Sequence, residues 1–461
     1  MAPLKPVPSI AIVGGGIAGL TLALNLIKLA KSDPSSQPRY TVTMYEAAHA
    51  FGEIGAGVSF GPNASHAMKC IGPEVYAAFE KTETRNQFKS KEDVWFDFRF
   101  GESVDGKFKV EGEDGTGQGE LIATVRCPGG QRGVKRSDFL DELIKHIPDG
   151  IAQFGKRVVH YTEDKNGKVT LHFKDGTTAV HDAVVGSDGI KSAIRKTVLA
   201  GTSKPEAANA VFSGKYCYRG LIPMDQAVGV LGEELASNSQ MYLGRHGHLL
   251  TFAIDQGKLM NVVAFNSAPE WTDDRWVVET NREKMIKGFA GWSSTATRII
   301  SLMQKTDVWA LFNDPPASTY VSKDGLVALI GDAAHATTPH KGSGAGMAIE
   351  DSFILGWLIS EALSIESVSV EKAISTAFRL YDATRRERTL RLVEDSRETG
   401  QLYDLEHPVY GTDKAKIREA LLTRMDWVWS HDVEEELAVT LDKLRHNLAA
   451  NRAENGAGLG A

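Results

Sequence analysis

The chain has 461 residues, of which 42 % are hydrophobic and 24 % charged, which is ordinary for a globular protein with a large core. Its net charge of −7 argues against a nucleic-acid partner and against an anionic membrane surface. The longest apolar run, residues 11–27, contains glycines and lacks a basic flank, so we expect a buried strand and helix, not a membrane span or signal peptide. The three cysteines are far apart, which predicts no metal site or disulfide framework and favours a reducing, cytoplasmic location.

Residues 10–23 are predicted to form a short buried strand, a glycine turn and the start of a helix. Their glycines have the spacing G-x-G-x-x-G of dinucleotide-binding proteins. The first glycine makes a tight turn, the second lets the backbone approach a pyrophosphate, and the third lets the helix pack on the strand. The helix N-terminus then faces the anion. The residues expected at this site are Gly14, Gly16, Ile17, Ala18 and Gly19.

A second part of the expected nucleotide site follows the next strand. Residues 40–46 are rich in β-formers and end in Glu46, whose carboxylate suits the two hydroxyls of an adenosine ribose. The usual gap to such an acid is about 20 residues; here it is longer, because residues 31–38 form a polar loop. The glycine-rich stretch 51–63, which includes Gly57, is predicted to be a loop that lies along a cofactor.

Further along the chain, the pattern of apolar residues predicts further strands and helices. Residues 95–100 alternate as a strand, and residues 136–143 open a helix. Residues 158–185 are predicted to be strands joined by tight turns at 166–167 and 175–176. Between about 207 and 320, apolar alternation predicts a mainly antiparallel sheet. Residues 326–332 form a buried strand and a turn, and helices are expected from about 346 onward.

Three motifs in this order identify the chain as similar to a known family. They are the glycine turn, the run GSDG at 186–189, and the run GDAAHATTPHKGSGAGMAIED at 331–351. Together they resemble the group A FAD-dependent aromatic hydroxylases, and the third run resembles the salicylate hydroxylase branch, particularly its fungal members in polyketide pathways. The resemblance implies an α/β fold with a Rossmann-like FAD-binding domain of the para-hydroxybenzoate hydroxylase type. It further implies a second, mainly antiparallel substrate domain and C-terminal helices. The expected parts are 1–205 and 321–400 for FAD binding, 206–320 for the substrate, and 401–461 for C-terminal helices and a tail.

The resemblance also assigns roles to residues. Asp332 matches the acid that binds the ribityl chain of FAD, and Arg136 matches a basic residue that contacts FAD. Asp188 matches a motif that contacts FAD and the nicotinamide cofactor. Glycines 342, 344 and 346 leave bare N–H groups at a helix N-terminus, which suit the negative charge of the reduced flavin. Gly344, Ala345 and Gly346 are therefore expected to bind FAD. Pro339 and His340 match a wall of the substrate site, although the family often has Tyr or Phe where His340 stands.

The implied activity is hydroxylation of a phenolic substrate with O₂ and NADPH or NADH, through a flavin C4a-hydroperoxide. The ring reacts best as a phenolate, so a cation or proton relay is expected beside it. Arg219 and Tyr242, both in the second domain, are the candidates for this role. Either a carboxylate is lost as CO₂, or an alkylated carbon is attacked and a dearomatised dienone results. The alternative is a flavoprotein oxidoreductase or halogenase without ring hydroxylation. A monomer or homodimer is expected.

Overall fold

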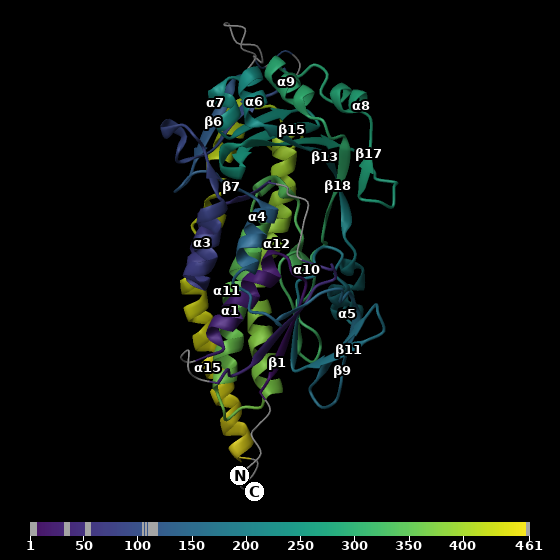
Figure 1. The fold of residues 1–461 in the computed structure, drawn as a ribbon, viewed down its shortest axis with the longest axis vertical. Helices are drawn as coiled ribbons and strands as arrows, with labels where there is room; N and C mark the ends of the chain where they lie inside the picture. Colours follow the sequence, from purple (N-terminus) through teal and green to yellow (C-terminus); the bar gives the residue numbers. More distant parts are fainter. Residues whose placement is uncertain are drawn as a thin grey trace.

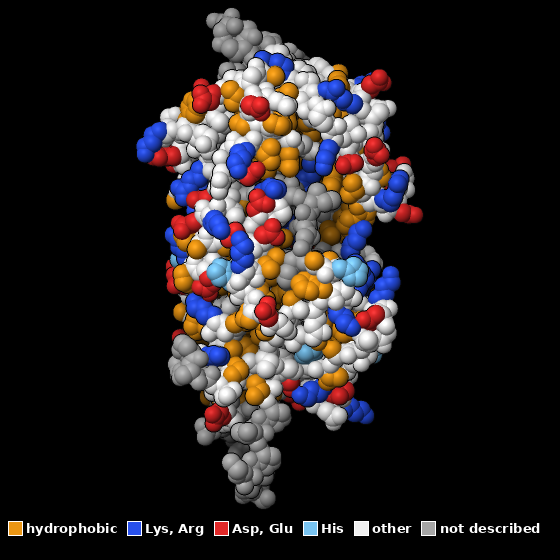
Figure 2. Space-filling model, in the orientation of Figure 1, with side chains coloured by type: hydrophobic (Ala, Val, Ile, Leu, Met, Phe, Trp, Pro, Cys, Tyr) orange, Lys and Arg blue, Asp and Glu red, His pale blue; other side chains and the backbone are white. Residues whose placement is uncertain are grey.

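We describe the fold from a computed structural model, which covers residues 7–31, 37–50, 57–103, 106, 108 and 119–457, with side chains up to residue 450. The polar loop expected at 31–38 and the glycine-rich stretch at 51–63 therefore lie partly outside the described residues. Figure 1 shows an elongated molecule in which long helices run beside a parallel sheet, with a second, larger sheet at one end. On the face drawn in Figure 2, acidic and basic side chains are interspersed. Among the described helices, none is long and apolar enough to cross a membrane.

A five-stranded parallel sheet forms the centre of one half of the molecule. Its strand order is β19-β12-β1-β2-β8, and every neighbouring pair is parallel. Residues 10–13 of β1 are buried between neighbours on both sides, as expected for a strand covered on both faces. The bounds are β1 Ser9–Val13, β2 Thr41–Tyr45, β8 Ala152–Gln153, β12 Ala183–Gly186 and β19 Val327–Leu329.

Long helices pack on this sheet and on one another. Helix α1 (Ile17–Leu29) lies against α11 (Gly344–Ser364), and the Asn25 amide nitrogen of α1 donates a hydrogen bond to the Ser352 carbonyl of α11 at 2.9 Å. Gly356 gives that amide its space, because a Cβ there would lie 2.3 Å from the Asn25 nitrogen. The other helices packed here are α2 Pro62–Ile71, α3 Pro73–Thr82, α4 Arg136–Ile144, α5 Ala193–Ala200, α12 Val370–Tyr403 and α15 Val433–Ala457.

The second sheet has eight strands in the order β17-β18-β13-β16-β15-β14-β5-β6. All its pairs are antiparallel except β14 with β5. Strands β5 and β6 come from within residues 1–205, so the sheet takes in part of the N-terminal segment. Its outer face is covered by α6, α7, α8 and α9, seen at the top of Figure 1. The bounds are β5 Val94–Phe100, β6 Leu121–Arg126, β13 Val211–Pro223, β14 Gln240–Gly244, β15 Gly247–Ile254, β16 Leu259–Ser267, β17 Val277–Glu279, β18 Asp307–Asn313, α6 Met224–Leu231, α7 Glu233–Ser237, α8 Arg282–Lys287 and α9 Ser294–Leu302.

Two small antiparallel sheets and several short helices complete the fold. The β9-β10-β11 meander contains the two tight turns predicted from the sequence, and β3-β7-β4 joins the two halves. The Rossmann-like half, the mainly antiparallel sheet and the C-terminal helices confirm the predicted fold class. The remaining bounds are β3 Gly57–Phe60, β4 Thr84–Arg85, β7 Arg132–Lys135, β9 Val158–Glu163, β10 Val169–Phe173, β11 Thr178–His181, α10 Asp332–His335, α13 Lys414–Thr423 and α14 Asp426–Trp429, with 3₁₀ turns η1 Lys89–Lys91, η3 Pro205–Ala208, η4 Asp255–Gly257 and η5 Pro339–Lys341.

Candidate FAD and substrate site

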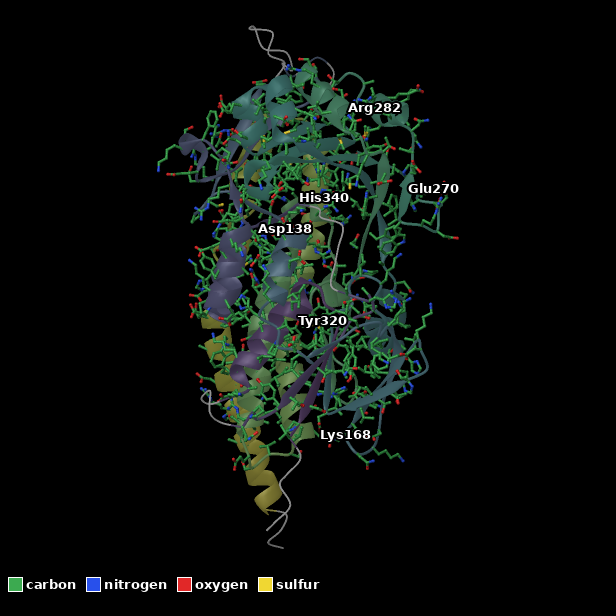
Figure 3. All side chains as sticks on the ribbon, in the orientation of Figure 1. Asp138, Lys168, Glu270, Arg282, Tyr320 and His340 are labelled. Carbon is green, nitrogen blue, oxygen red and sulfur yellow. The ribbon has the colours of Figure 1, made fainter. Side chains whose placement is uncertain are left out.

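A cavity of about 470 Å³ lies between the parallel sheet and the inner face of the eight-stranded sheet. Figure 3 shows His340 near this junction, in the middle of the molecule. The lining brings together segments that are far apart in the chain: the glycine turn after β1, the start of β3, the first residue of α4, part of β13, Asp332 of α10, and residues 337–345 up to the start of α11. Of the residues predicted from the sequence, the cavity is lined by Gly16, Ile17, Ala18, Gly57, Arg136, Arg219, Asp332, Pro339, His340, Gly344 and Ala345.

The glycine turn has the geometry that its spacing predicts. Gly14 has φ +107°, and a Cβ there would lie 2.4 Å from the Ser187 carbonyl oxygen. A Cβ at Gly19 would lie 2.0 Å from the Gly14 carbonyl oxygen, so only glycine lets α1 pack this closely on β1. Gly16 is different: the nearest atom to an added Cβ is an Arg136 guanidinium nitrogen at 3.7 Å, so this backbone faces the cavity. The turn therefore leaves room for a pyrophosphate beside a cation.

Two helix N-termini open onto the same cavity. Helix α1 begins after Gly16, and α11 begins after Ser343. Neither first turn receives a side-chain cap from the part of the chain that the structure describes, so their N–H groups point at the cavity. One N-terminus suits the pyrophosphate of FAD, and the other suits the negative charge that develops on a reduced flavin ring. The residues present thus fit a bound FAD.

The charged residues that line this space are Arg136, Arg219, Asp332 and Lys341, of which Lys341 pairs with Asp395. Burial lowers the pKa of Arg136, the nearby Asp332 carboxylate opposes that change, and the like charge of Arg219 adds to it. Arg136, Asp332 and Arg219 all line the same cavity. Because two guanidiniums face one carboxylate, the cavity carries a net positive charge and favours an anionic ligand.

Other residues predicted to bind the cofactor, among them Glu46, Asp188 and Gly346, are not among the cavity-lining residues. The Glu46 carboxylate accepts hydrogen bonds from the Gly15 N–H at 2.7 Å and the Ala48 N–H at 2.8 Å, which places it against the glycine turn. The Asp188 carboxylate accepts from the Ala193 N–H at 2.7 Å and so caps α5. Gly346 lets α11 approach α2, since its Cβ would lie 3.0 Å from that of Ala64.

The two predicted substrate residues lie on opposite faces of the eight-stranded sheet. Arg219 points to the inner, cavity face with its neighbours Cys217 and Val263, and its guanidinium lies 5.6 Å from the Trp309 ring centroid. Tyr242 points to the outer face, is fully buried in the cluster under α6 to α9, and is not among the cavity-lining residues. The alternation of the strand places Met241 at the cavity instead.

A buried ionic network supports the turn that carries Asp332. Asp351 of α11 accepts hydrogen bonds from the Gly331 N–H at 3.1 Å and from His335 Nε2 at 2.6 Å. The Arg385 guanidinium of α12 then binds Asp351 at 3.0 Å and Glu350 at 2.7 Å. His335 therefore has a packing and hydrogen-bonding role, and the trailing Glu-Asp pair of the third motif ties the turn to two helices.

A second buried chain of polar groups reaches the cavity wall at His340. His340 Nδ1 lies 3.3 Å from His248 Nε2, and His248 Nδ1 lies 2.6 Å from the Asp404 carboxylate. Lys215 pairs with the other oxygen of Asp404. Sequence reasoning singled out His340 but not Asp404, which lies 156 residues from His248 with no spacing motif to connect them.

The fold and the cavity define an α/β protein that holds a flavin dinucleotide beside an apolar chamber, and comparison with known proteins agrees. A domain family described as "FAD binding domain" matches residues 303–396. The chain is 39 % identical to a salicylate hydroxylase from Pseudomonas putida, covering 94 % of both chains. It is 40 % identical to a 6-methylsalicylate 1-monooxygenase from Aspergillus terreus, covering 93 % of this chain and 90 % of the relative. A solved salicylate hydroxylase in a substrate complex superposes with a TM-score of 0.78 at 34 % identity, over 95 % of this chain and 98 % of the other.

The chain belongs to the salicylate hydroxylase family of FAD-dependent monooxygenases. It is a flavoprotein aromatic hydroxylase that uses FAD, NAD(P)H and O₂ on a phenolic substrate, as the three motifs predict. The fold is shared more widely: an FAD- and substrate-bound structure called CtdE superposes with a TM-score of 0.75 at 18 % identity, over 96 % of this chain and all of the other.

Proposed function

We propose that the protein hydroxylates an ortho-hydroxybenzoate at the ring carbon that bears the carboxylate, with loss of CO₂. The observation that carries this proposal is the placement of Arg219 in the FAD cavity, beside the apolar inner-face side chains Cys217 and Val263. A guanidinium binds a carboxylate through paired hydrogen bonds, and it stays charged over the whole working pH range. The relatives named as salicylate and 6-methylsalicylate enzymes support the same substrate class.

The register of the sheet defines the floor of the proposed substrate chamber. On the inner face, Cys217 of β13 pairs with Phe265 of β16. Arg219, two residues further along β13 and on the same face, pairs with Val263. The His340 ring lies 5.1 Å from the Phe265 ring. A cation and an imidazole therefore flank an apolar floor, on which a single aromatic ring that carries both a carboxylate and a hydroxyl would rest.

The chain's own residues bind, orient and exclude water. Arg219 would hold the carboxylate, and His340 would contact the phenol hydroxyl. Gly16 and Arg136 would hold the pyrophosphate, Glu46 the ribose, and Asp332 the ribityl chain, while the α11 N-terminus would stabilise negative charge on the ring. FAD, when bound, supplies the redox chemistry by which a hydride from NAD(P)H and O₂ give one oxygen atom to the substrate. In balance, the reaction consumes two protons, the second oxygen atom leaves as water, and the carboxylate leaves as CO₂.

The test is to supply salicylate labelled in its carboxylate and to measure labelled CO₂, the catechol product, NAD(P)H consumed and hydrogen peroxide. We expect CO₂ and catechol in equal amounts. Arg219→Gln should weaken salicylate binding by about 10- to 150-fold, since a hydrogen bond to a charged group contributes about 1.5–3 kcal/mol. NAD(P)H consumption by this variant should yield mainly hydrogen peroxide.

Arg126 is the matched control, because it lies in the same sheet with an exposed side chain paired to Asp93. Arg126→Gln should leave binding and coupling unchanged. A hydroxylated product that keeps its carboxylate would contradict the proposed outcome, as would a dienone formed from an alkylphenol without CO₂ release. If NAD(P)H consumption in Arg219→Gln stays coupled to hydroxylation, Arg219 does not bind the substrate.

A further inference from the structure

A cluster of three side chains with metal-binding atoms lies where α2 meets α15. His66 and Cys70 are four residues apart on α2, so their side chains lie on the same face of that helix. Glu434 comes from the first turn of α15. One atom of each residue, a ring nitrogen, a sulfur or a carboxylate oxygen, lies within 4.8 Å of the other two. None of the three is among the described residues that line the FAD cavity.

The distances within the cluster are close to the edges of a tetrahedral zinc site. Zinc bonds of about 2.3 Å to sulfur and about 2.0 Å to nitrogen or oxygen give a sulfur–nitrogen edge of about 3.5 Å and a nitrogen–oxygen edge of about 3.3 Å. Cys70 Sγ lies 3.8 Å from His66 Nε2, and Glu434 Oε2 lies 3.1 Å from the same nitrogen. The Glu434 side chain is 62 % exposed, so its carboxylate can turn to adjust the third edge, between oxygen and sulfur.

The chemistry of the three ligands favours zinc over magnesium and calcium. A thiolate and an imidazole are ligands of Zn²⁺, whereas Mg²⁺ and Ca²⁺ take oxygen ligands. One thiolate, one carboxylate and one neutral imidazole together balance the charge of a divalent ion. The charged neighbours are Asp432, which acts on both Cys70 and His66, and Lys28, which acts on Cys70 and also donates to the Ile71 carbonyl at 2.6 Å. The Asp432 carboxylate adds to the attraction for a cation, and Lys28 opposes it.

We propose that His66, Cys70 and Glu434 bind one Zn²⁺ ion, with water as the fourth ligand. The side chains of His66 and Glu434 are 44 % and 62 % exposed, which leaves the fourth position open to solvent. The Cys70 S–H bond breaks as the sulfur–zinc bond forms, and the proton leaves to water. Burial and the Glu434 carboxylate raise the pKa of this thiol to about 11, so the metal-free thiol carries the proton that zinc displaces.

The ion would join a helix near the start of the chain to the last helix. Helix α2 is bound to α11, since the Asn63 amide donates to the Glu350 carboxylate at 2.7 Å. Helix α15 is bound to α12 through Glu436 and Arg385. Zinc would therefore fasten α15 to the rest of the molecule from a second side. The wide separation of the three cysteines predicts no metal site, because that criterion considers cysteines alone and two of these ligands are a histidine and a glutamate.

Cobalt is the spectroscopic probe, because Co²⁺ can occupy a zinc site and has intense red absorption bands when it is tetrahedral. We would titrate Co²⁺ into the untagged, FAD-loaded protein with its thiols reduced, and record the bands at wavelengths where oxidised FAD does not absorb. One equivalent should produce the tetrahedral bands, and Zn²⁺ should remove them. Zn²⁺ should also slow the alkylation of Cys70 by N-ethylmaleimide, mapped by peptide mass spectrometry. Cys127 and Cys217 are buried and serve as internal controls.

Three variants remove the ligands one at a time. Cys70→Ala, His66→Gln and Glu434→Gln should each weaken Zn²⁺ binding at least tenfold, because loss of a group that merely orients a metal ligand already costs about 10–100-fold. Each should keep its bound FAD, as seen in the flavin absorption spectrum, which shows that the variant is folded. Cys70→Ala with wild-type affinity for Zn²⁺ would overturn the site, and so would an octahedral Co²⁺ spectrum in the wild type.

Two matched controls separate this site from other surface ligands. Glu435→Gln changes an exposed carboxylate in the same turn of α15. His160→Gln changes one of two exposed histidines, His160 and His172, whose rings stack 4.2 Å apart. Both variants should bind Zn²⁺ as the wild type does. Loss of binding in His160→Gln with retention in His66→Gln would place the ion at the stacked pair and overturn the proposal.

Discussion

Arg385→Met tests whether the buried ionic network holds the FAD half together. The Arg385 side chain is fully buried, and its guanidinium bonds to Asp351 and Glu350 of α11 and to Glu436 of α15. Methionine keeps much of the length of the side chain but removes the charge. Because three carboxylates would lose this buried partner, we expect the free energy of unfolding to fall by about 3–5 kcal/mol.

The size of the thermal shift follows from the length of the chain. Unfolding entropy is about 2.1 cal/mol/K per residue; for 461 residues this amounts to about 1 kcal/mol/K. The apparent Tm should therefore fall by about 3–5 °C, measured by circular dichroism of the FAD-free protein. FAD affinity should fall as well, because Asp351 also bonds to the Gly331 N–H, next to Asp332.

The loss of stability in Arg385→Met should depend on pH. Burial would raise the pKa of Glu350, but Arg385 and Arg388 outweigh it and bring the pKa from 4.5 to about 2. A carboxyl whose pKa is lower in the folded state contributes stability that is complete above about pH 4.5 and is lost as the pH falls toward 2. The difference in stability between wild type and Arg385→Met should therefore narrow below about pH 4.5.

Arg386 provides the control one residue away. It pairs with Asp382 of the same helix at 2.9 Å, and its side chain is 35 % exposed. Arg386→Met should cost about 1 kcal/mol or less, as for other partly exposed pairs. Equal and small Tm shifts in the two variants would refute the reasoning, because the network would then contribute no more than a surface pair.

Two further predictions concern single side chains of the site. Asp332→Ala should weaken FAD binding by about 10- to 150-fold, because it removes one hydrogen bond to a charged group. Quenching of FAD fluorescence measures the affinity, and the exposed Asp225→Ala is the control. Equal affinity in the two variants would count against a role of Asp332 in FAD binding. Tyr242→Phe should leave hydroxylation and stability nearly unchanged, because its buried hydroxyl has no hydrogen-bond partner within the described residues. A tenfold loss of activity in steady-state assays of that variant would show that Tyr242 acts on the substrate after all.

The fold class could be predicted from the sequence, and many of the residues predicted to hold FAD line one cavity, because both depend on spacing within short stretches of the chain. At Gly19 an added Cβ would lie 2.0 Å from the Gly14 carbonyl oxygen, so the glycine is required by a neighbour only five residues away in the chain. The same holds for the third motif, where the turn at Asp332 and the N-terminus of α11 adjoin in the chain.

The substrate half depends on information that the sequence does not contain locally. Tyr242 and Met241 alternate on one strand, and only the packing of α6 to α9 decides which face is outer. Strands β5 and β6 join the eight-stranded sheet through a parallel pair with β14, across about 140 residues of chain. The contact of His248 with Asp404 likewise depends on where the end of α12 lies relative to β15.

The order of the parallel sheet has a consequence for biosynthesis. Strand β1 pairs with β12, and β12 pairs with β19, so the sheet that carries Gly14 is completed only when residue 329 has been made. At about 5–20 residues per second, a ribosome needs roughly 15 to 60 s to pass from Gly14 to Asp332. Until β19 has been made, β12 lacks one of its two neighbours in the sheet, and the eight-stranded sheet must form from the intervening chain. A nascent or truncated chain that stops before α10 lacks Asp332 and one of the two helix N-termini at the cavity. We therefore expect a nascent chain to retain FAD only after translation has reached the last third of the protein.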